Sequence, residues 1–273
     1  MLWIPRPAVL ARGDILVGMS APLPNLLSFV SREHDQFLIS LANDTREMEF
    51  IGRLQTLYEA ALPDVEVPED DMAVFQLLTF THYYFLLATT MLMRCHLSEA
   101  FGCARIAIDA TLIGAHLIKN RGDNVAYTNR TKPFDNFARY LGNLIKAGKP
   151  LPHQLVPELV RLQKTMSTFT SHADIGAFTH RIDITSVEGR PQIRVQYFQF
   201  SRTAAERQIH ALTLFHVFVM VLDVFSEFLA LEHKIVPADW QFEMIRIGVE
   251  LEREVKRLKA TLPPDMVGDE GGG

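Results

Sequence analysis

The stretch SHADIGAFTH places two imidazoles and a carboxylate within nine residues, in His172, Asp174 and His180. Imidazole nitrogens and carboxylate oxygens bind transition metals, so these three residues are the candidate metal ligands. His172 is also a candidate proton-transfer group if a second polar side chain positions it. A third interpretation is a turn that ends a helix, in which the side chains bond to nearby backbone. Because no fourth ligand is identifiable, we expect no bound metal and no other cofactor.

A second group of polar residues shares one side of a predicted helix in the stretch HLSEAFGCARIAIDATLIGAHLIK. At about 100° per residue a narrow sector of this helix contains Ser98, Arg105, Asp109 and His116. The other positions are mostly apolar, which is typical of a central helix in a bundle. We therefore expect Arg105 to be buried or nearly so, paired with Asp109 and within reach of the His172 turn, since an unpaired buried guanidinium is costly.

The segments AFGCARIAIDATLIGAHL and MSTFTSHADIGAF resemble a group of uncharacterised bacterial helical proteins with an Arg-x-x-x-Glu helix and a Ser-x-x-x-His turn. That group is loosely associated with the HEPN and abortive-infection proteins. The resemblance covers about residues 75–230 and implies an all-helical fold. It sets Arg105 and Asp109 where the group has Arg and Glu, and it sets Ser167 and His172 near its Ser and His. The chain has Asp for Glu and one more residue between Ser and His, and the Arg-x(4–6)-His motif of HEPN ribonucleases is absent.

These patterns together supply the candidate site residues. The candidate catalytic residues are Arg105, Asp109 and His172, because a charged pair can position an imidazole for proton transfer. The candidate ligand-binding residues are Ser98, His116 and, from the resemblance, Ser167.

Other chemistries lack the residues that they require. No histidine has a glutamate three residues before it, which excludes the ligand pattern of di-iron bundles. His34 and Asp35 form an HD pair, but phosphohydrolases with that pair need an earlier histidine and His34 is the first in the chain. The phosphate-binding loops, the zinc-protease motif and the G-x-S-x-G motif are absent as well.

Charge and cysteine content limit the partners and the compartment. The net charge of -5 gives no general attraction to nucleic acid, although residues 33–73 are acidic and residues 117–165 carry nine basic residues against three acidic ones. Cys95 and Cys103 fall in one predicted helix, roughly 12 Å apart and too far to bridge, which favours a cytoplasmic location.

Two apolar runs are long enough to be considered as membrane spans. Residues 72–93 carry no charge, but Gln76, Tyr83 and Thr90 recur every seven residues as a polar seam that suits contact with other helices. Residues 209–231 are interrupted by charged side chains that are costly in lipid. We therefore expect both runs to be core helices of a soluble protein, with no membrane insertion.

Hydrophobic periodicity predicts a mainly α fold, a helical bundle with one small β-hairpin insertion. Alternation around EGRP places the hairpin near residues 181–200. The predicted helices cover about 25–62 (one helix or a broken pair), 69–93, 98–119, a short helix near 134–145, another near 159–169, 202–232 and 238–260. We expect an N-terminal extension over 1–24, a single domain over 25–262 and a flexible tail over 263–273.

The expected function is that of a non-enzymatic binding or interaction module whose polar seam holds a small molecule or specifies helix contacts. We expect a homo-oligomer, with nucleic acid as an unfavoured partner. Two alternatives are a divergent HEPN-like enzyme directed at nucleic acid, in which Arg105 and His172 act together, and a metal-binding protein that uses His172, Asp174 and His180.

Overall fold

The computed structural model describes residues 26–62, 67–131, 134, 137–170, 182–187, 190–198, 201, 203–232 and 236–262. Over these residues the chain is mainly helical with one antiparallel two-stranded hairpin, as predicted. The α-helices are α1 (Leu26–Asn43), α2 (Thr45–Ala61), α3 (Met72–Met93), α4 (Leu97–Lys119), α5 (Asp123–Thr128), α6 (Phe137–Lys146), α7 (Val156–Thr170), α9 (Ala204–Ser226) and α10 (Trp240–Lys259). A 3-10 turn, η2 (Glu69–Asp71), precedes α3, and a π-helical turn, η4 (Glu227–Glu232), continues α9. The strands are β1 (Ile182–Val187) and β2 (Arg190–Val195).

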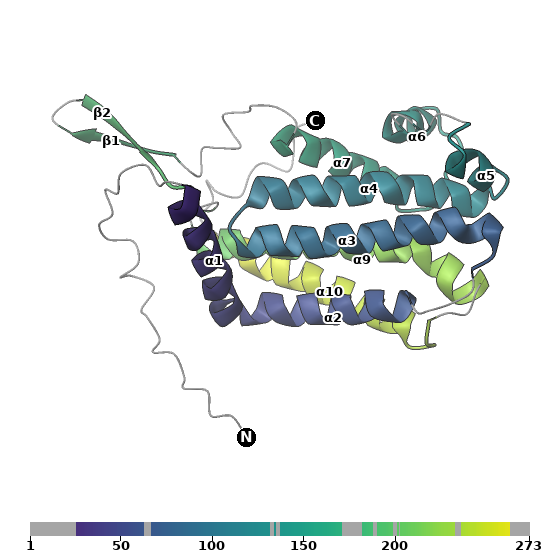
Figure 1. The fold of residues 1–273 in the computed structure, drawn as a ribbon, viewed down its shortest axis with the longest axis horizontal. Helices are drawn as coiled ribbons and strands as arrows, with labels where there is room; N and C mark the ends of the chain where they lie inside the picture. Colours follow the sequence, from purple (N-terminus) through teal and green to yellow (C-terminus); the bar gives the residue numbers. More distant parts are fainter. Residues whose placement is uncertain are drawn as a thin grey trace, which may run out of the picture.

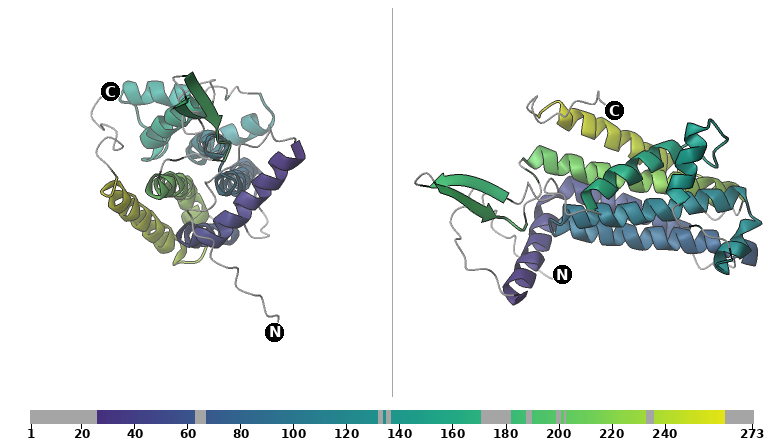
Figure 2. Two further views of the ribbon diagram at one scale, coloured as in Figure 1. Left: turned by 90° about the vertical axis from the view of Figure 1, so that its left-hand side faces the viewer. Right: turned by 90° about the horizontal axis from the view of Figure 1, so that it is seen from above.

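The long helices lie roughly along one axis as a bundle, with α1 crossing one end and α5 and α6 at the other (Figures 1 and 2). Helix α4 is central, because it contacts α3, α6, α7 and α9. Helix α9 contributes Phe215, Phe218 and Phe225 to the core, where all three side chains are fully buried. Burial of one such side chain stabilises the fold by about 1.5 to 3 kcal/mol. The core therefore fixes α4 in place along most of its length.

The helices and the hairpin predicted from the sequence agree with the structure in type and lie close to their predicted positions. The segment 25–62 is a broken pair of helices that meet at Asp44, and α3, α4 and α9 begin and end within a few residues of their predicted limits. In the hairpin, Ile182 pairs with Val195 and Ile184 with Ile193. Helix α5, however, lies in a stretch expected to be a loop.

The placement of the two cysteines in one helix was wrong. Cys95 lies in the tight turn between α3 and α4, buried and with a backbone φ of 63°, whereas Cys103 lies in α4. Among the described residues neither thiol forms a disulfide. The Cys95 N–H donates to Leu92 O and the His96 N–H to Met91 O, so the left-handed residue completes the hydrogen bonds at the end of α3.

Three helical stretches are long and apolar enough to cross a membrane, namely Glu69–Met93, Leu97–Lys119 and Ala204–Ala230. In the bundle their most apolar windows are 50%, 56% and 72% buried, respectively. The seam of α3 faces outward rather than toward other helices, because Gln76 and Tyr83 are exposed. One face of α3 is thus core and the other is an uncharged surface.

Candidate functional site

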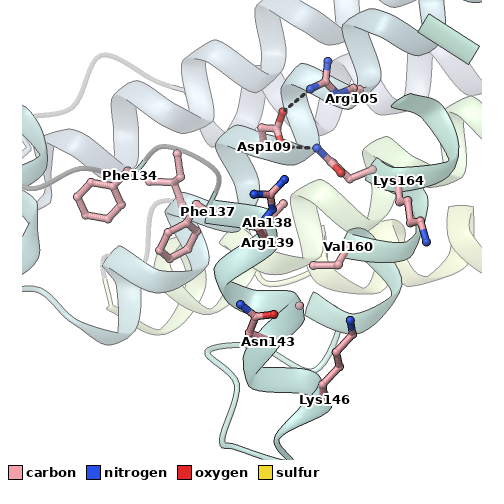
Figure 3. Close-up of a pocket in the computed structure, with 13 residues that line it drawn as sticks. Arg105, Asp109, Phe134, Phe137, Ala138, Arg139, Asn143, Lys146, Val160 and Lys164 are labelled. Carbon is pink, nitrogen blue, oxygen red and sulfur yellow. Dashed lines mark hydrogen bonds and ion pairs between the residues drawn. The ribbon is translucent and has the colours of Figure 1, made fainter. Parts of the chain in front are cut away.

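A cleft of about 730 Å³ opens between α4, α6 and α7. Its walls are formed by one stretch of each helix together with Phe134, which precedes α6. The lining residues are Arg105, Asp109, Ile113, Phe134, Phe137, Ala138, Arg139, Gly142, Asn143, Lys146, Val160, Gln163 and Lys164. Figure 3 shows these side chains arranged around one space. Two of the candidate residues predicted from the sequence, Arg105 and Asp109, are therefore brought into one site.

The charge of the cleft is strongly positive. Among the described residues, four cationic side chains line it, Arg105, Arg139, Lys146 and Lys164, against the single carboxylate of Asp109. On α6 the two cations stand seven residues apart with Asn143 between them, so they share one helix face. Arg139 and Lys146 have no carboxylate within ion-pair distance among the described residues. The cleft is therefore a cation-lined hollow that its own acidic residue does not neutralise.

Asp109 sits between two donors. The Arg105 Nη2 lies 4.0 Å from Asp109 Oδ2, and Gln163 Nε2 donates to Asp109 Oδ1 at 3.1 Å. Burial raises the pKa of the Asp109 carboxyl, and Arg105 and the Gln163 hydrogen bond offset that effect only in part. Asp109 is thus held by α7 as well as by its own helix.

The expectation that Arg105 is buried was wrong. The Arg105 and Asp109 side chains are 35% and 38% exposed, because they lie on the wall of an open cleft rather than between packed helices. The Arg105 Nε is nevertheless buried and has no hydrogen-bond partner within the described residues. A buried N–H without a partner costs free energy.

An aromatic wall borders the cleft on the α6 side. Phe134 and Phe137 line it, with ring centroids 5.6 Å apart. Behind them His116 lies 5.2 Å from the Phe137 ring, and its Nε2 is 2.8 Å from Asp123 Oδ2. His116 therefore supports the wall and does not line the cleft.

The other predicted ligand-binding residues are not in the cleft lining. Ser98 lies half-buried in the first turn of α4, seven residues before Arg105. The Ser167 hydroxyl donates to Gln163 O at 2.7 Å, within α7. All four residues in the predicted seam of α4 are partly exposed, but only Arg105 and Asp109 reach the cleft.

The candidate metal ligands His172, Asp174 and His180 lie outside the described residues. The predicted proximity of His172 to Arg105 falls outside them as well. Among the described residues there is no group of three or more His, Cys, Asp or Glu side chains that could hold a metal ion.

Arg139, Lys146, Lys164, Phe134 and Phe137 were not singled out as site residues from the sequence. Two signals pointed to them: the excess of basic residues over 117–165 and the helical spacing of the two phenylalanines. What the spacing could not show is that α6 and α7 bring these residues opposite Arg105.

Comparison with protein-family models, with curated proteins and with solved structures finds no match to this chain. The resemblance to HEPN-associated bacterial proteins therefore stays a prediction. The function has to be argued from the cleft itself.

Proposed function

We propose that the protein is a binding module that holds a small anionic molecule in the cleft between α4, α6 and α7. The observation that carries the proposal is the concentration of Arg105, Arg139, Lys146 and Lys164 around one carboxylate. Cations gathered in a concave, partly desolvated space attract a phosphate or carboxylate more strongly than the same cations on an open surface.

The volume and the lining of the cleft further limit the kind of ligand that fits it. A volume of about 730 Å³ falls within the range of small-molecule sites, roughly 300 to 1,000 Å³. Phe134 and Phe137 offer ring faces and edges to an apolar or aromatic part of the ligand. As a guanidinium in the lining, Arg105 can donate charge-assisted hydrogen bonds to an anionic oxygen. An anion that carries a ring, such as a nucleotide, combines these features.

Titration calorimetry with two probes tests the proposal. Inorganic pyrophosphate reports on the cations alone, and adenosine monophosphate reports on cations and aromatic wall together. A double variant, Arg139→Gln with Lys146→Gln, should weaken the binding of both probes at least tenfold, since each lost charged hydrogen bond is worth about 1.5 to 3 kcal/mol. Phe137→Leu should weaken the binding of adenosine monophosphate and leave that of pyrophosphate unchanged, because only the first probe carries a ring.

Lys256→Gln is the matched control, because Lys256 is exposed on α10, which contributes nothing to the cleft. It should leave both affinities unchanged. Asp109→Asn should tighten pyrophosphate binding several-fold, because it removes the one carboxylate that the described part of the lining contains. Failure of both probes to bind the unaltered protein at millimolar concentration would overturn the proposal.

A second candidate, an enzyme directed at nucleic acid, rests on the same positive charge and on the resemblance of the Arg105 helix. Incubation with a single-stranded RNA of about twenty nucleotides distinguishes this enzyme from a module that only binds a small anion. If that RNA is cleaved and the cleavage is lost in both Arg105→Gln and His172→Asn, the small-ligand proposal gives way to the second candidate.

A further inference from the structure

Asp109 of α4 and Gln163 of α7 form a pair of hydrogen-bond acceptors in the lining of the cleft, which we call the acceptor patch. The Gln163 Nε2 donates to Asp109 Oδ1 at 3.1 Å. Because a carboxylate only accepts, the amide nitrogen has to face it, and the Gln163 Oε1 points elsewhere. The other carboxylate oxygen, Asp109 Oδ2, is 4.0 Å from Arg105 Nη2, beyond hydrogen-bond distance. The described residues therefore leave Asp109 Oδ2 and Gln163 Oε1 as acceptors for a ligand.

The acceptor patch and the cations of α6 lie on different sides of the cleft. Figure 3 shows Asp109 at one end of the lining and Asn143 and Lys146 at the other. Phe134 and Phe137 lie on a third side (Figure 3). The Asp109 carboxylate repels an anionic group, whereas Lys146 attracts it. We therefore expect the anionic group of a ligand to bind near α6, away from the acceptor patch.

The group that fits the acceptor patch is a neutral hydrogen-bond donor. In the described lining four cations face one carboxylate, so a ligand ammonium would meet a net positive charge. A hydroxyl carries no charge and donates to a carboxylate in a charge-assisted hydrogen bond. Since Asp109 and Gln163 are in direct contact, two neighbouring hydroxyls of one ligand can reach one acceptor each.

We propose that the cleft selects a nucleotide whose sugar keeps its ring hydroxyls, and that Asp109 and Gln163 recognise those hydroxyls. The ribose of such a ligand carries a phosphate, a base and two adjacent hydroxyls in three directions. The cleft offers cations, an aromatic wall and the acceptor patch on three sides, one for each group. This inference rests on the proposed function and adds the kind of sugar that the ligand carries.

Titration calorimetry with adenosine monophosphate and 2′,3′-dideoxyadenosine monophosphate tests the inference. The two probes share the phosphate and the base and differ only in the sugar hydroxyls. At about pH 8 the Asp109 carboxyl is ionised although burial raises its pKa. The unaltered protein should bind the hydroxylated probe about tenfold more tightly or better, because a site built to bond a hydroxyl disfavours the analogue that lacks it.

Two variants test the residues. Asp109→Asn puts an amide nitrogen in place of Oδ2, because Oδ1 still has to accept from Gln163, and Gln163→Leu removes the second acceptor. Each variant should reduce the ratio of the two affinities to about threefold or less. Asp35→Asn is the matched control, since it makes the same carboxylate-to-amide change on the exposed side of α1, outside the lining, and should retain the full ratio.

Pyrophosphate, measured in parallel, separates this inference from the proposed function. If pyrophosphate binds and the two nucleotides bind equally well, the hydroxyl recognition is wrong and the anion site stands. A preference for the hydroxylated probe that persists in both variants overturns the assignment to Asp109 and Gln163. If none of the three probes binds the unaltered protein at millimolar concentration, the proposed function fails, and the inference that rests on it fails too.

Discussion

Gly114 of α4 lies directly against the ring of Phe225 of α9. A Cβ added at position 114 would stand 2.8 Å from both Cε1 and Cζ of that ring, closer than non-bonded carbons approach. Phe225 is fully buried, so the ring has no free space into which it can turn. The absence of a side chain at position 114 therefore sets how closely the two central helices approach.

Gly114→Ala should destabilise the protein by about 1 to 3 kcal/mol, because the added methyl group forces the two helices apart or the ring out of its preferred rotamer. The free energy of unfolding from urea denaturation, followed by circular dichroism, measures the change. Gly52→Ala is the control: Gly52 lies in α2 with nothing within 4 Å of an added Cβ, and alanine there should stabilise the helix by roughly 0.5 to 1 kcal/mol. Equal effects at the two positions would contradict the steric argument.

Asp109→Asn should change the free energy of unfolding by less than about 1 kcal/mol. The ion pair with Arg105 is long and partly exposed, and asparagine still accepts the hydrogen bond from Gln163. Burial already disfavours the charge, since it raises the pKa of the Asp109 carboxyl. Denaturant midpoints measure the change, and a loss of about 3 kcal/mol or more would show instead that the pair acts as a buried one.

Arg53 joins α2 to α10 through a forked contact. Its Nε donates to Glu243 Oε1 at 2.8 Å and its Nη1 to Glu250 Oε2 at 2.7 Å. Arg53→Ala should cost about 1 to 3 kcal/mol, because it removes two charged hydrogen bonds between α2 and α10, and Arg53→Lys should recover part of that loss. Thermal unfolding followed by calorimetry measures both variants.

Arg161→Ala is the comparison for Arg53. Arg161 pairs with Glu158 on the exposed side of α7, and such a pair contributes about 0.5 kcal/mol or less. A larger loss at Arg161 than at Arg53 would be incompatible with the assignment of the α2–α10 contact.

Stability should fall as the pH drops below about 6.5, in part because of His153. Burial lowers the pKa of His153, against the opposing effect of Asp223 and Glu227, and the Leu155 N–H donates to its Nδ1 at 3.2 Å. The folded state therefore favours the neutral ring, whereas the unfolded chain takes up a proton from pH 6.5 downward. One such group contributes at most about 1.4 kcal/mol per pH unit, and this contribution ends below the folded pKa.

His153→Asn keeps an acceptor for Leu155 and removes the titration. Its free energy of unfolding should therefore vary less between pH 7.5 and 5.5 than that of the unaltered protein. His34→Asn, on the exposed side of α1, should retain the full variation. An identical pH dependence in all three proteins would exclude His153 as a contributor.

Much of the fold could be predicted from the sequence, because it depends on local periodicity. The apolar spacing of residues 98–119 predicts a central helix, and α4 is that helix. Alternation in residues 181–200 predicts the hairpin. Helix α5 escaped prediction because its six residues are too few to show a period, and Cys95 was misplaced because a left-handed turn residue has no sequence signal when it is not glycine.

The site could be predicted only in part. The narrow polar sector of α4 identified Arg105 and Asp109, because a helix alone decides which of its residues share a side. Their burial was predicted wrongly, since it depends on how far α6 and α7 stand from α4. The same distance decides that Arg139 and Lys146 face Arg105, and no spacing along the chain encodes it.

The apolar character of α3, α4 and α9 also has a consequence for the newly made chain. Before these helices have found one another, each presents a stretch with the length and hydropathy of a membrane span. The same segments can then either associate with one another in water or insert into lipid, and these two processes compete. The ratio of the two rates decides the outcome, and the yield of refolding with and without lipid vesicles measures that ratio.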